Sequence, residues 1–208
     1  MIEFVFDEEV AEEAEQGGGS FGTLDTGVYK VTINHASLGK TTGGNNTLSL
    51  GITTDSGQET TIWSAFGTID KTWASGSENF GYKDFQSFMA ACGAKSITPV
   101  PYDLKKEDGT LIKKLSVVKE LHGVICTLAI QKEFDFYNGE EGESNVIHSS
   151  YNSKGQTYLE AKSNLKAEKI DKVGSRLKDR TTKRYKAAQA SASLGTEVEE
   201  SEETESLL

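Results

Sequence analysis

Apolar and polar residues alternate through Val28–Leu38, and this period of two constrains the fold more than any other feature of the chain. Successive side chains of a strand point to opposite faces, so the pattern predicts a strand with one buried side. The turn sequence TTGGNN at 41–46 follows, and the alternation resumes at 48–52. A second turn leads to a third predicted strand, Glu59–Phe66. The sequence therefore predicts an antiparallel meander of three strands.

One helix and further strands are predicted after the meander. Apolar residues recur at i, i+3, i+4 and i+7 in Lys83–Cys92, which is the spacing of an amphipathic helix, and Gly93 ends it. Pro99–Lys114 is polar, and we expect an excursion there with a turn at 107–109. The remaining predictions are a strand at Leu121–Phe136, a loop at Asn138–Ser144, a strand at Val146–Tyr151 and a further strand at Gln156–Glu160.

Three antiparallel strands, a helix and two or three more strands is the order of elements in an OB-fold barrel. We therefore expect a mainly β protein built on an OB-fold-like antiparallel barrel with one short helix; an antiparallel sandwich is the alternative. The expected organisation is an acidic N-terminal arm with a Gly-rich joint (1–20), the barrel domain (21–163), a basic segment whose spacing allows a helix (164–190), and a disordered acidic tail (191–208).

The charges of the chain are segregated. Residues 1–15 hold seven acids and no base, and residues 196–208 hold six acids and no base. The net charge of −10 for the whole chain therefore becomes +3 for residues 16–195. Within that body, residues 154–186 carry eleven Lys and Arg against four Asp and Glu. A basic region between acidic ends is typical of a protein that binds a polyanion and carries a segment imitating one.

Aromatic residues interleaved with bases are the first group of candidate binding residues. Aromatic rings stack on the bases of a single strand, and lysine or arginine neutralises its phosphates. Any one ring could instead fill the core, where large aromatics also belong. The expected groove consists of Lys30, Trp63, Trp73, Lys132, Phe134 and Phe136, extended by Tyr151 and Tyr158.

The basic segment and the tail supply the other candidates. Arg176, Arg180 and Arg184 lie in a basic run that is either a solvated helix face or an extension of the groove. The tail is either a solubilising end or a docking segment for a partner, and its apolar tip favours docking. The predicted partner-binding residues are Glu199, Glu200, Glu202, Glu203, Glu205, Leu207 and Leu208.

Motifs for catalysis, nucleotide binding or metal binding are not found. Gly39-Lys40-Thr41 lacks the earlier glycine and the following helix of a P-loop. His35, His122 and His148 occur singly, without metal-ligand spacing, and the two cysteines lack a CxxC. We therefore expect no enzyme, no cofactor and no bound metal. With no apolar run of about 20 residues and no signal sequence, we expect a cytosolic protein, in the host cytoplasm if it is viral.

The chain resembles the single-stranded DNA-binding proteins of tailed bacteriophages. The resemblance lies in the strand around Thr26–Val31, the GGNN hairpin, the helix segment Tyr82–Met89, the strand Lys119–Lys132 and the acidic, apolar-tipped end. It implies an OB-fold, sequence-independent coating of single strands and a tail that recruits replication proteins. The chain differs from many members of the family in ending with leucines, where they end with phenylalanine.

These observations predict a non-catalytic protein that binds single-stranded DNA in replication, recombination or repair and recruits other replication or recombination proteins through its tail. Homo-oligomer formation is left open. One alternative is a β-rich phage structural or assembly protein whose charged ends guide packing. Another is a metal-dependent nuclease that uses carboxylates such as Asp84 and Asp135.

Overall fold

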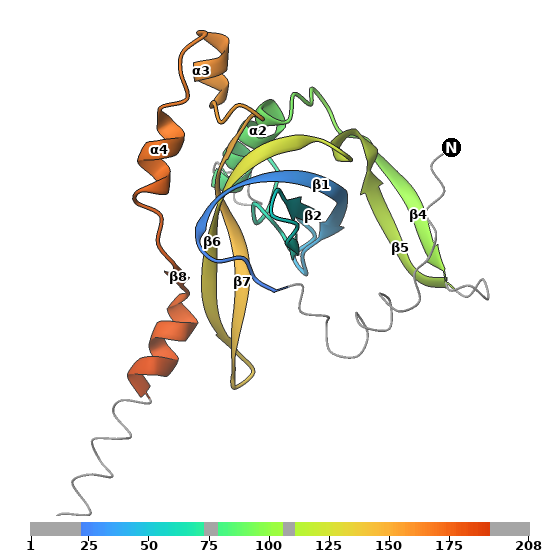
Figure 1. Cartoon of the computed structure of the whole chain (residues 1–208). Coiled ribbons are helices and arrows are strands. Elements are labelled where there is room, and N and C mark those ends of the chain that lie inside the picture. Colours follow the sequence, from blue (N-terminus) through green and yellow to red (C-terminus); the bar gives the residue numbers. More distant parts are fainter. Residues whose placement is uncertain (1–21, 73–78, 106–110, 192–208) are drawn as a thin grey trace, which may run out of the picture.

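The computed structural model describes residues 22–72, 79–105 and 111–191 of the chain (Figure 1). The elements are β1 (Gly27–Lys40), β2 (Asn46–Thr54), β3 (Glu59–Ile62), α2 (Phe80–Ala91), β4 (Pro99–Lys105), β5 (Leu111–Val118), the 3-10 turn η1 (Lys119–Leu121), β6 (Ile125–Tyr137), β7 (Glu140–Tyr151), α3 (Tyr158–Lys162), α4 (Lys169–Gly174) and β8 (Arg180–Thr181). Residues 183–191 are also helical.

β1 is the central strand, and the predicted mainly β, antiparallel fold is confirmed. One edge of β1 pairs with β2; the other pairs with β6 near its start and with β5 at Ser37 and Leu38. β3 continues the sheet from β2, and β7 continues it from β6, again antiparallel. Among the described strands β3 pairs only with β2 and β7 only with β6, so the sheet does not close into a barrel through backbone pairing.

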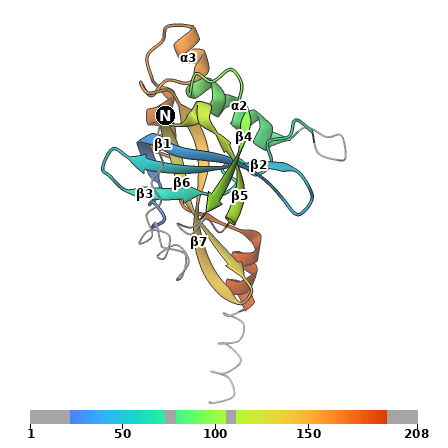
Figure 2. The same ribbon diagram turned by 90° about the vertical axis from the view of Figure 1, so that its right-hand side faces the viewer.

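The hydrophobic core lies on the inner face of this curved sheet, with α2 packed beside β7 (Figures 1 and 2). Ile33, Leu50 and Leu128 are fully buried there. α2 adds Phe88, whose ring centroid lies 5.0 Å from that of Phe66. Each such side chain stabilises the fold by roughly 1.5–3 kcal/mol through removal of apolar surface from water.

α2 begins at Phe80, three residues before the predicted start, because Asn79 caps it. The Asn79 side chain accepts a hydrogen bond from the Gly81 N–H and donates to the carbonyl oxygens of Thr68 and Asp70. Gly81 is required at this close approach, since a Cβ there would lie 2.2 Å from the Phe66 carbonyl oxygen. The cap therefore joins the helix to the loop that follows β3.

Part of the predicted excursion at Pro99–Lys114 is a β-hairpin, which corrects that prediction. β4 and β5 pair antiparallel and project from the body (Figures 1 and 2). β4 pairs only with β5 among the described strands, so Pro99 and Pro101 occupy an edge strand, where a missing N–H is tolerated. The predicted turn at 107–109 lies outside the described residues.

Two predictions near the end of the sheet are also corrected. The loop expected at Asn138–Ser144 is only a two-residue turn, with Asn138 and Gly139 at φ 53° and 89°, and β7 begins directly after it. The strand expected at Gln156–Glu160 is instead the start of α3. Thr157 and Glu160 form a capping box, which fixes a helical first turn.

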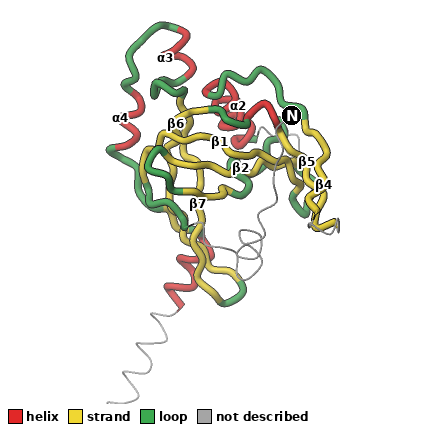
Figure 3. Tube along the Cα trace, turned by 45° about the vertical axis from the view of Figure 1, so that its right-hand side comes forward, coloured by secondary structure: helices red, strands yellow, loops and turns green. Residues whose placement is uncertain are grey.

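The basic C-terminal segment packs against the sheet along β6 (Figures 1 and 3). α4 lies over β1, where a Cβ on Gly174 would contact the Val28 side chain at 3.4 Å. β8 then pairs in parallel with β6, with Arg180 opposite Glu133 and Thr181 opposite Phe134. The predicted basic segment at 164–190 therefore contacts the sheet and contains the short helix α4 and the strand β8.

Candidate nucleic-acid interface

A β-bulge in β1 places two consecutive polar residues on the outer face of the sheet. Ile33 pairs with Ile52, but the next pair is His35 with Gly51, so Asn34 is the extra residue. Val31, Ile33 and Ala36 are buried on the inner face. Asn34 and His35 therefore both face outwards, and the Asn34 side-chain amide donates to Thr53 Oγ1 at 2.6 Å.

The His35 ring rests flat against the backbone of β2. A Cβ on Gly51 would lie 2.0 Å from His35 Cε1 and 2.2 Å from Nδ1, so only glycine leaves room for the ring. Gly51 is buried although it lies on the outer face, whereas His35 remains exposed. Burial of the covered side lowers the pKa of His35, and His122 lowers it further by charge repulsion. The ring is therefore neutral at pH 7.

Trp63 lies on the same outer face, directly after β3. Its predecessor Ile62 is fully buried and pairs with Leu50, so Trp63 points outwards and is 72% exposed. Gly51 pairs with both His35 and Thr61, so Trp63, the first residue after β3, lies two residues beyond the position that the His35 ring covers. Two residues of strand span about 7 Å. The two rings can therefore contact neighbouring nucleotides of an extended strand.

Lys30 marks the other end of this surface. Its side chain is exposed, and its carbonyl oxygen accepts the Asp55 N–H from the turn between β2 and β3. Between the ends lies a shallow cavity of about 160 Å³ whose lining includes His35, Gly51 and Thr61. We call this surface the β1–β3 face, defined by Lys30, Asn34, His35, Gly51, Thr61 and Trp63. It offers one cation, two rings and several hydrogen-bonding groups, and the Glu59 carboxylate, which accepts a hydrogen bond from Thr53, also lines the cavity.

Lys132, which was predicted to line the same groove, lies in β6 outside the β1–β3 face and forms ion pairs with two acids of the protein. Its Nζ lies 3.0 Å from Asp25 Oδ1 and 3.4 Å from Glu143 Oε2, and its side chain is 18% exposed. The hydrogen bond that Lys132 donates to Asp25 is the main reason that the pKa of Lys132 is raised. Lys132 thus joins β6 to the segment before β1 and to β7, and its charge is neutralised within the protein.

Phe134 and the two C-terminal arginines meet on β6 rather than in an open groove. The Phe134 ring packs on Tyr185 with centroids 5.8 Å apart. Arg180 Nε lies 3.2 Å from Glu133 Oε2, and Arg184 pairs with Asp135 and lies over the Tyr137 ring. We call residues 178–191 the strap. The strap covers Phe134, and both arginines are ion-paired in the structure.

The Asp135 carboxylate is central to the strap contacts. Its pKa is lowered first by the hydrogen bond from the Thr182 hydroxyl, with further contributions from the Phe136 N–H and Arg184. Phe136 itself is half-buried. Asp135 therefore serves to attach the strap, and no group of three His, Cys, Asp or Glu in the described parts of the chain could hold a metal ion.

The prediction that Tyr151 extends the groove is wrong: its side chain is 1% exposed and cannot stack on a base in this conformation. Its hydroxyl is hydrogen-bonded to Ser149 Oγ at 3.0 Å. Tyr158 is 54% exposed, with Lys162 Nζ 5.9 Å from its ring centroid, and Arg176 is exposed. Trp73 and the tail residues 199–208 lie outside the described residues.

Both cysteines are free thiols. Cys126 is buried in β6 and Cys92 is partly buried after α2, and neither forms a disulfide. A hydrogen bond with Cys126, followed by burial, raises the pKa of Cys92, which makes it a poor nucleophile.

Comparison with known proteins gives no family assignment. No protein-family model matches the sequence, and no curated protein matches it. In the described residues, no helix has the length and apolar character needed to cross a membrane.

His35 and Asn34 are the site residues that sequence reasoning missed. A shift in the alternation reveals them: Val31 and Ile33 share one phase, and Ala36 and Leu38 share the other. Such a shift within one strand indicates a bulge, and bulges often redirect side chains at functional sites.

Proposed function

We propose that this protein binds single-stranded DNA without sequence preference and serves DNA replication, recombination or repair. The observation that carries the proposal is the pair of rings on the β1–β3 face, Trp63 at 72% exposure and the neutral His35 ring seated on Gly51. Exposed rings are costly in water, and stacked bases would cover them. Each stacked base contributes roughly 1–3 kcal/mol, whatever its identity.

The arrangement of elements supports an OB-type architecture for this function. β1 pairs with β2 on one edge and with β6 on the other, and α2 lies in the chain between β3 and β6. OB-folds bind oligonucleotides on the face of their second and third strands. The corresponding strands here are β2 and β3, which form the β1–β3 face, and the β4–β5 hairpin is an addition to that plan.

The charge distribution supplies the second part of the proposal. Lys30 on the β1–β3 face and the exposed lysines around α3 and α4 can neutralise phosphates. The acidic tail, as in the phage proteins that the sequence resembles, would recruit replication or recombination proteins. Its acidic residues can also compete with DNA for these lysines.

The test is a titration of the full chain with a labelled oligo-dT, followed by fluorescence anisotropy at several salt concentrations. We expect saturable binding that weakens steeply with salt, because phosphate contacts release counterions. Trp63→Ala should weaken binding by roughly 5- to 150-fold at every salt concentration, since stacking is not screened. Tyr102→Ala on the projecting hairpin is the matched control, since it removes an exposed ring from another surface.

Absence of binding at low salt would overturn the proposal. Equal affinities of wild type and Trp63→Ala would leave DNA binding in place but remove it from the β1–β3 face. Large oligomers that form without DNA and do not respond to it, seen by size-exclusion chromatography, would instead favour a structural or assembly protein.

A further inference from the structure

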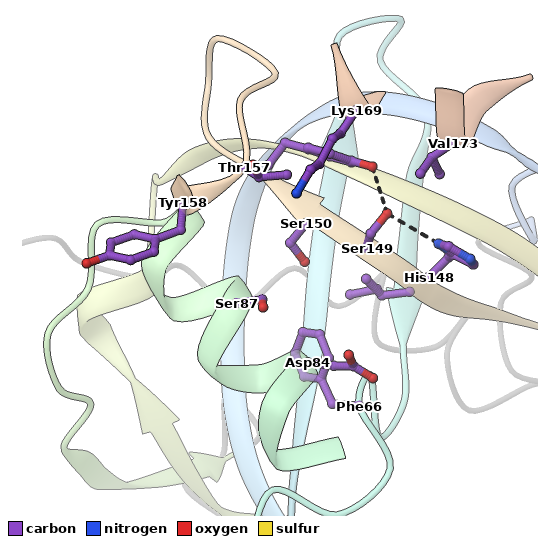
Figure 4. Close-up of a pocket in the computed structure, with 12 residues that line it drawn as sticks. Phe66, Asp84, Ser87, His148, Ser149, Ser150, Thr157, Tyr158, Lys169 and Val173 are labelled. Carbon is purple, nitrogen blue, oxygen red and sulfur yellow. Dashed lines mark hydrogen bonds between the residues drawn. The ribbon is translucent and has the colours of Figure 1, made fainter. Parts of the chain in front are cut away.

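A second cavity, of about 240 Å³, lies where α3 and α4 fold over α2 and β7 (Figure 4). We call it the cap cavity. Its side walls carry Asp84 and Ser87 from α2, Tyr158 from α3, and Lys169 and Val173 from α4. Its floor carries His148, Ser149 and Ser150 from β7. None of the DNA-binding residues of the β1–β3 face contributes to it.

The wall that carries Lys169 is held rigidly by Glu160. One carboxylate oxygen of Glu160 accepts from the Thr157 N–H at 2.8 Å and from its hydroxyl at 2.9 Å. The other accepts from the N–H groups of Glu168 and Lys169 at 3.1 and 3.0 Å. These bonds lower the pKa of Glu160 to about 2, so it is ionised at neutral pH. One buried carboxylate thus fixes the start of α3 and the start of α4 together.

The floor is shaped by a bulge in β7. Ala129 pairs with Ser149 and Ile130 with Ile147, so His148 is the extra residue. The bulge turns His148 and Ser149 to the same side, and Ser149 Oγ lies 3.3 Å from His148 Nδ1 and 3.0 Å from the Tyr151 hydroxyl (Figure 4). The side chains of the floor are therefore oriented before any ligand arrives.

Three polar side-chain groups of the cap cavity make no hydrogen bond or salt bridge within the described part of the protein, and two of them, Asp84 and Lys169, are exposed to solvent. Partial burial raises the pKa of Asp84, and the nearby His148 opposes this effect electrostatically. The Lys169 ammonium group makes no salt bridge with any described acid. Ser150 is only 8% exposed, lines the cavity, and its hydroxyl makes no hydrogen bond to a described residue.

From these groups we infer that the cap cavity binds one nucleotide, with its phosphate at Lys169 and Ser150 and the amino-bearing edge of its base at Asp84. A lysine ammonium and a serine hydroxyl both donate to phosphate oxygens. A carboxylate accepts from the exocyclic amino groups of adenine and cytosine. Phe66, Ile147 and Val173 supply apolar surface for the faces of the base and sugar.

The inference rests on the proposed function in one respect: the nucleotide would be either free or the 5′-phosphorylated end of a bound strand. The chemistry is the same in both cases, and the two sources are separated by experiment. Free dAMP probes the cavity alone. A 5′-phosphorylated oligo-dA compared with its 5′-hydroxyl counterpart probes the strand end.

The test is calorimetric titration of the full chain with dAMP, deoxyadenosine and inorganic phosphate. Amide NMR shifts of Ser149, Ser150 and Lys169 report the location of binding. We expect dAMP to bind saturably, and Lys169→Met to weaken it about tenfold, as loss of a hydrogen bond to a charged group does. Lys172→Met is the matched control: it removes the same charge from α4, but Lys172 does not line the cavity and pairs with Glu168 at 3.8 Å.

Asp84→Ala separates base recognition from phosphate binding. We expect it to weaken dAMP about tenfold while leaving inorganic phosphate binding equal or tighter, because a repelling carboxylate is lost. Thermal unfolding of each variant shows that it is folded, and Lys169→Arg should restore most of the affinity.

Several outcomes would overturn the inference: no saturable dAMP binding, equal losses in Lys169→Met and Lys172→Met, or amide shifts confined to the β1–β3 face. Binding of free amino acids in place of nucleotides would assign the cavity to another class of ligand and would also overturn it. Retained oligo-dT binding with no dAMP binding refutes the cap cavity alone. Retained dAMP binding with no oligo-dT binding refutes the proposed function alone.

Discussion

Replacing Gly51 by alanine tests the β1–β3 face by displacing the His35 ring, without removing any side chain from that face. The new Cβ would lie 2.0 Å from His35 Cε1 and 2.2 Å from Nδ1, far inside van der Waals contact. Gly51 lies in the middle of β2 and has no positive φ, so the strand itself accepts alanine. The His35 ring must therefore move away from the Gly51 backbone, while the pairing of β1 with β2 is retained.

The expected loss follows from what the ring would contribute. If His35 stacks on one base, removing it from that position costs about 1–3 kcal/mol of binding free energy. Oligo-dT affinity should then fall roughly 5- to 150-fold. His35→Ala should cause a loss of the same size. The double variant should lose no more than either single variant, because both changes remove the same contact.

Fluorescence anisotropy with a labelled oligo-dT at fixed low salt measures these affinities. Gly142→Ala is the matched control, since a Cβ at that glycine of β7 meets nothing within 4 Å. Wild-type affinity in both Gly51→Ala and His35→Ala would refute a role for His35 in binding. Additive losses in the double variant would show that alanine at Gly51 acts through something other than the ring.

Three further outcomes are expected. A chain ended at Ala190 should bind oligo-dT more tightly than the full chain, most clearly at low salt, if the acidic tail competes for the basic surface; equal affinities leave the tail only a partner-docking role. Phe88→Ala should lower the free energy of unfolding by about 3–5 kcal/mol, measured by urea denaturation, because Phe88 is fully buried and packs on Phe66. Glu160→Gln should be less stable than wild type at neutral pH, and the difference should shrink as the pH falls from about 4.5 to about 2, because the folded pKa of Glu160 lies below its usual value and its stabilisation is lost on protonation; a difference independent of pH, followed by circular dichroism, would contradict this.

The sequence predicts the part of the fold that is encoded locally. The alternation of Val28–Leu38 and the apolar spacing of Lys83–Cys92 identify β1 and α2, because a buried face imposes its period on nearby residues. The β4–β5 hairpin was missed since its pairing lies at an edge, where prolines and lysines are tolerated. α3 was read as a strand although Thr157 and Glu160 form a capping box, a signal that was present in the sequence.

The candidate site residues, too, were predicted correctly only where their exposure follows from the local strand pattern. Trp63 and Lys30 were predicted, and both are exposed on the β1–β3 face, because each follows or lies within a strand whose phase was clear. Tyr151 was predicted for the groove and is buried, because the α3–α4 segment folds back over its part of β7. No local pattern shows which distant segment covers an outward-facing residue. The position of Tyr151 therefore depended on contacts that only the structure shows.

The fold also changes where a polyanion would meet positive charge. Arg180 and Arg184, the centre of the basic run in sequence, are paired with Glu133 and Asp135 on β6. In both pairs the arginine is exposed and the acid is largely covered. The pairing of β8 with β6, the hydrogen bond from Thr182 to Asp135 and the packing of Tyr185 on Phe134 also hold the strap in place. A polyanion would therefore meet exposed lysines such as Lys30 before it met the arginines of the strap.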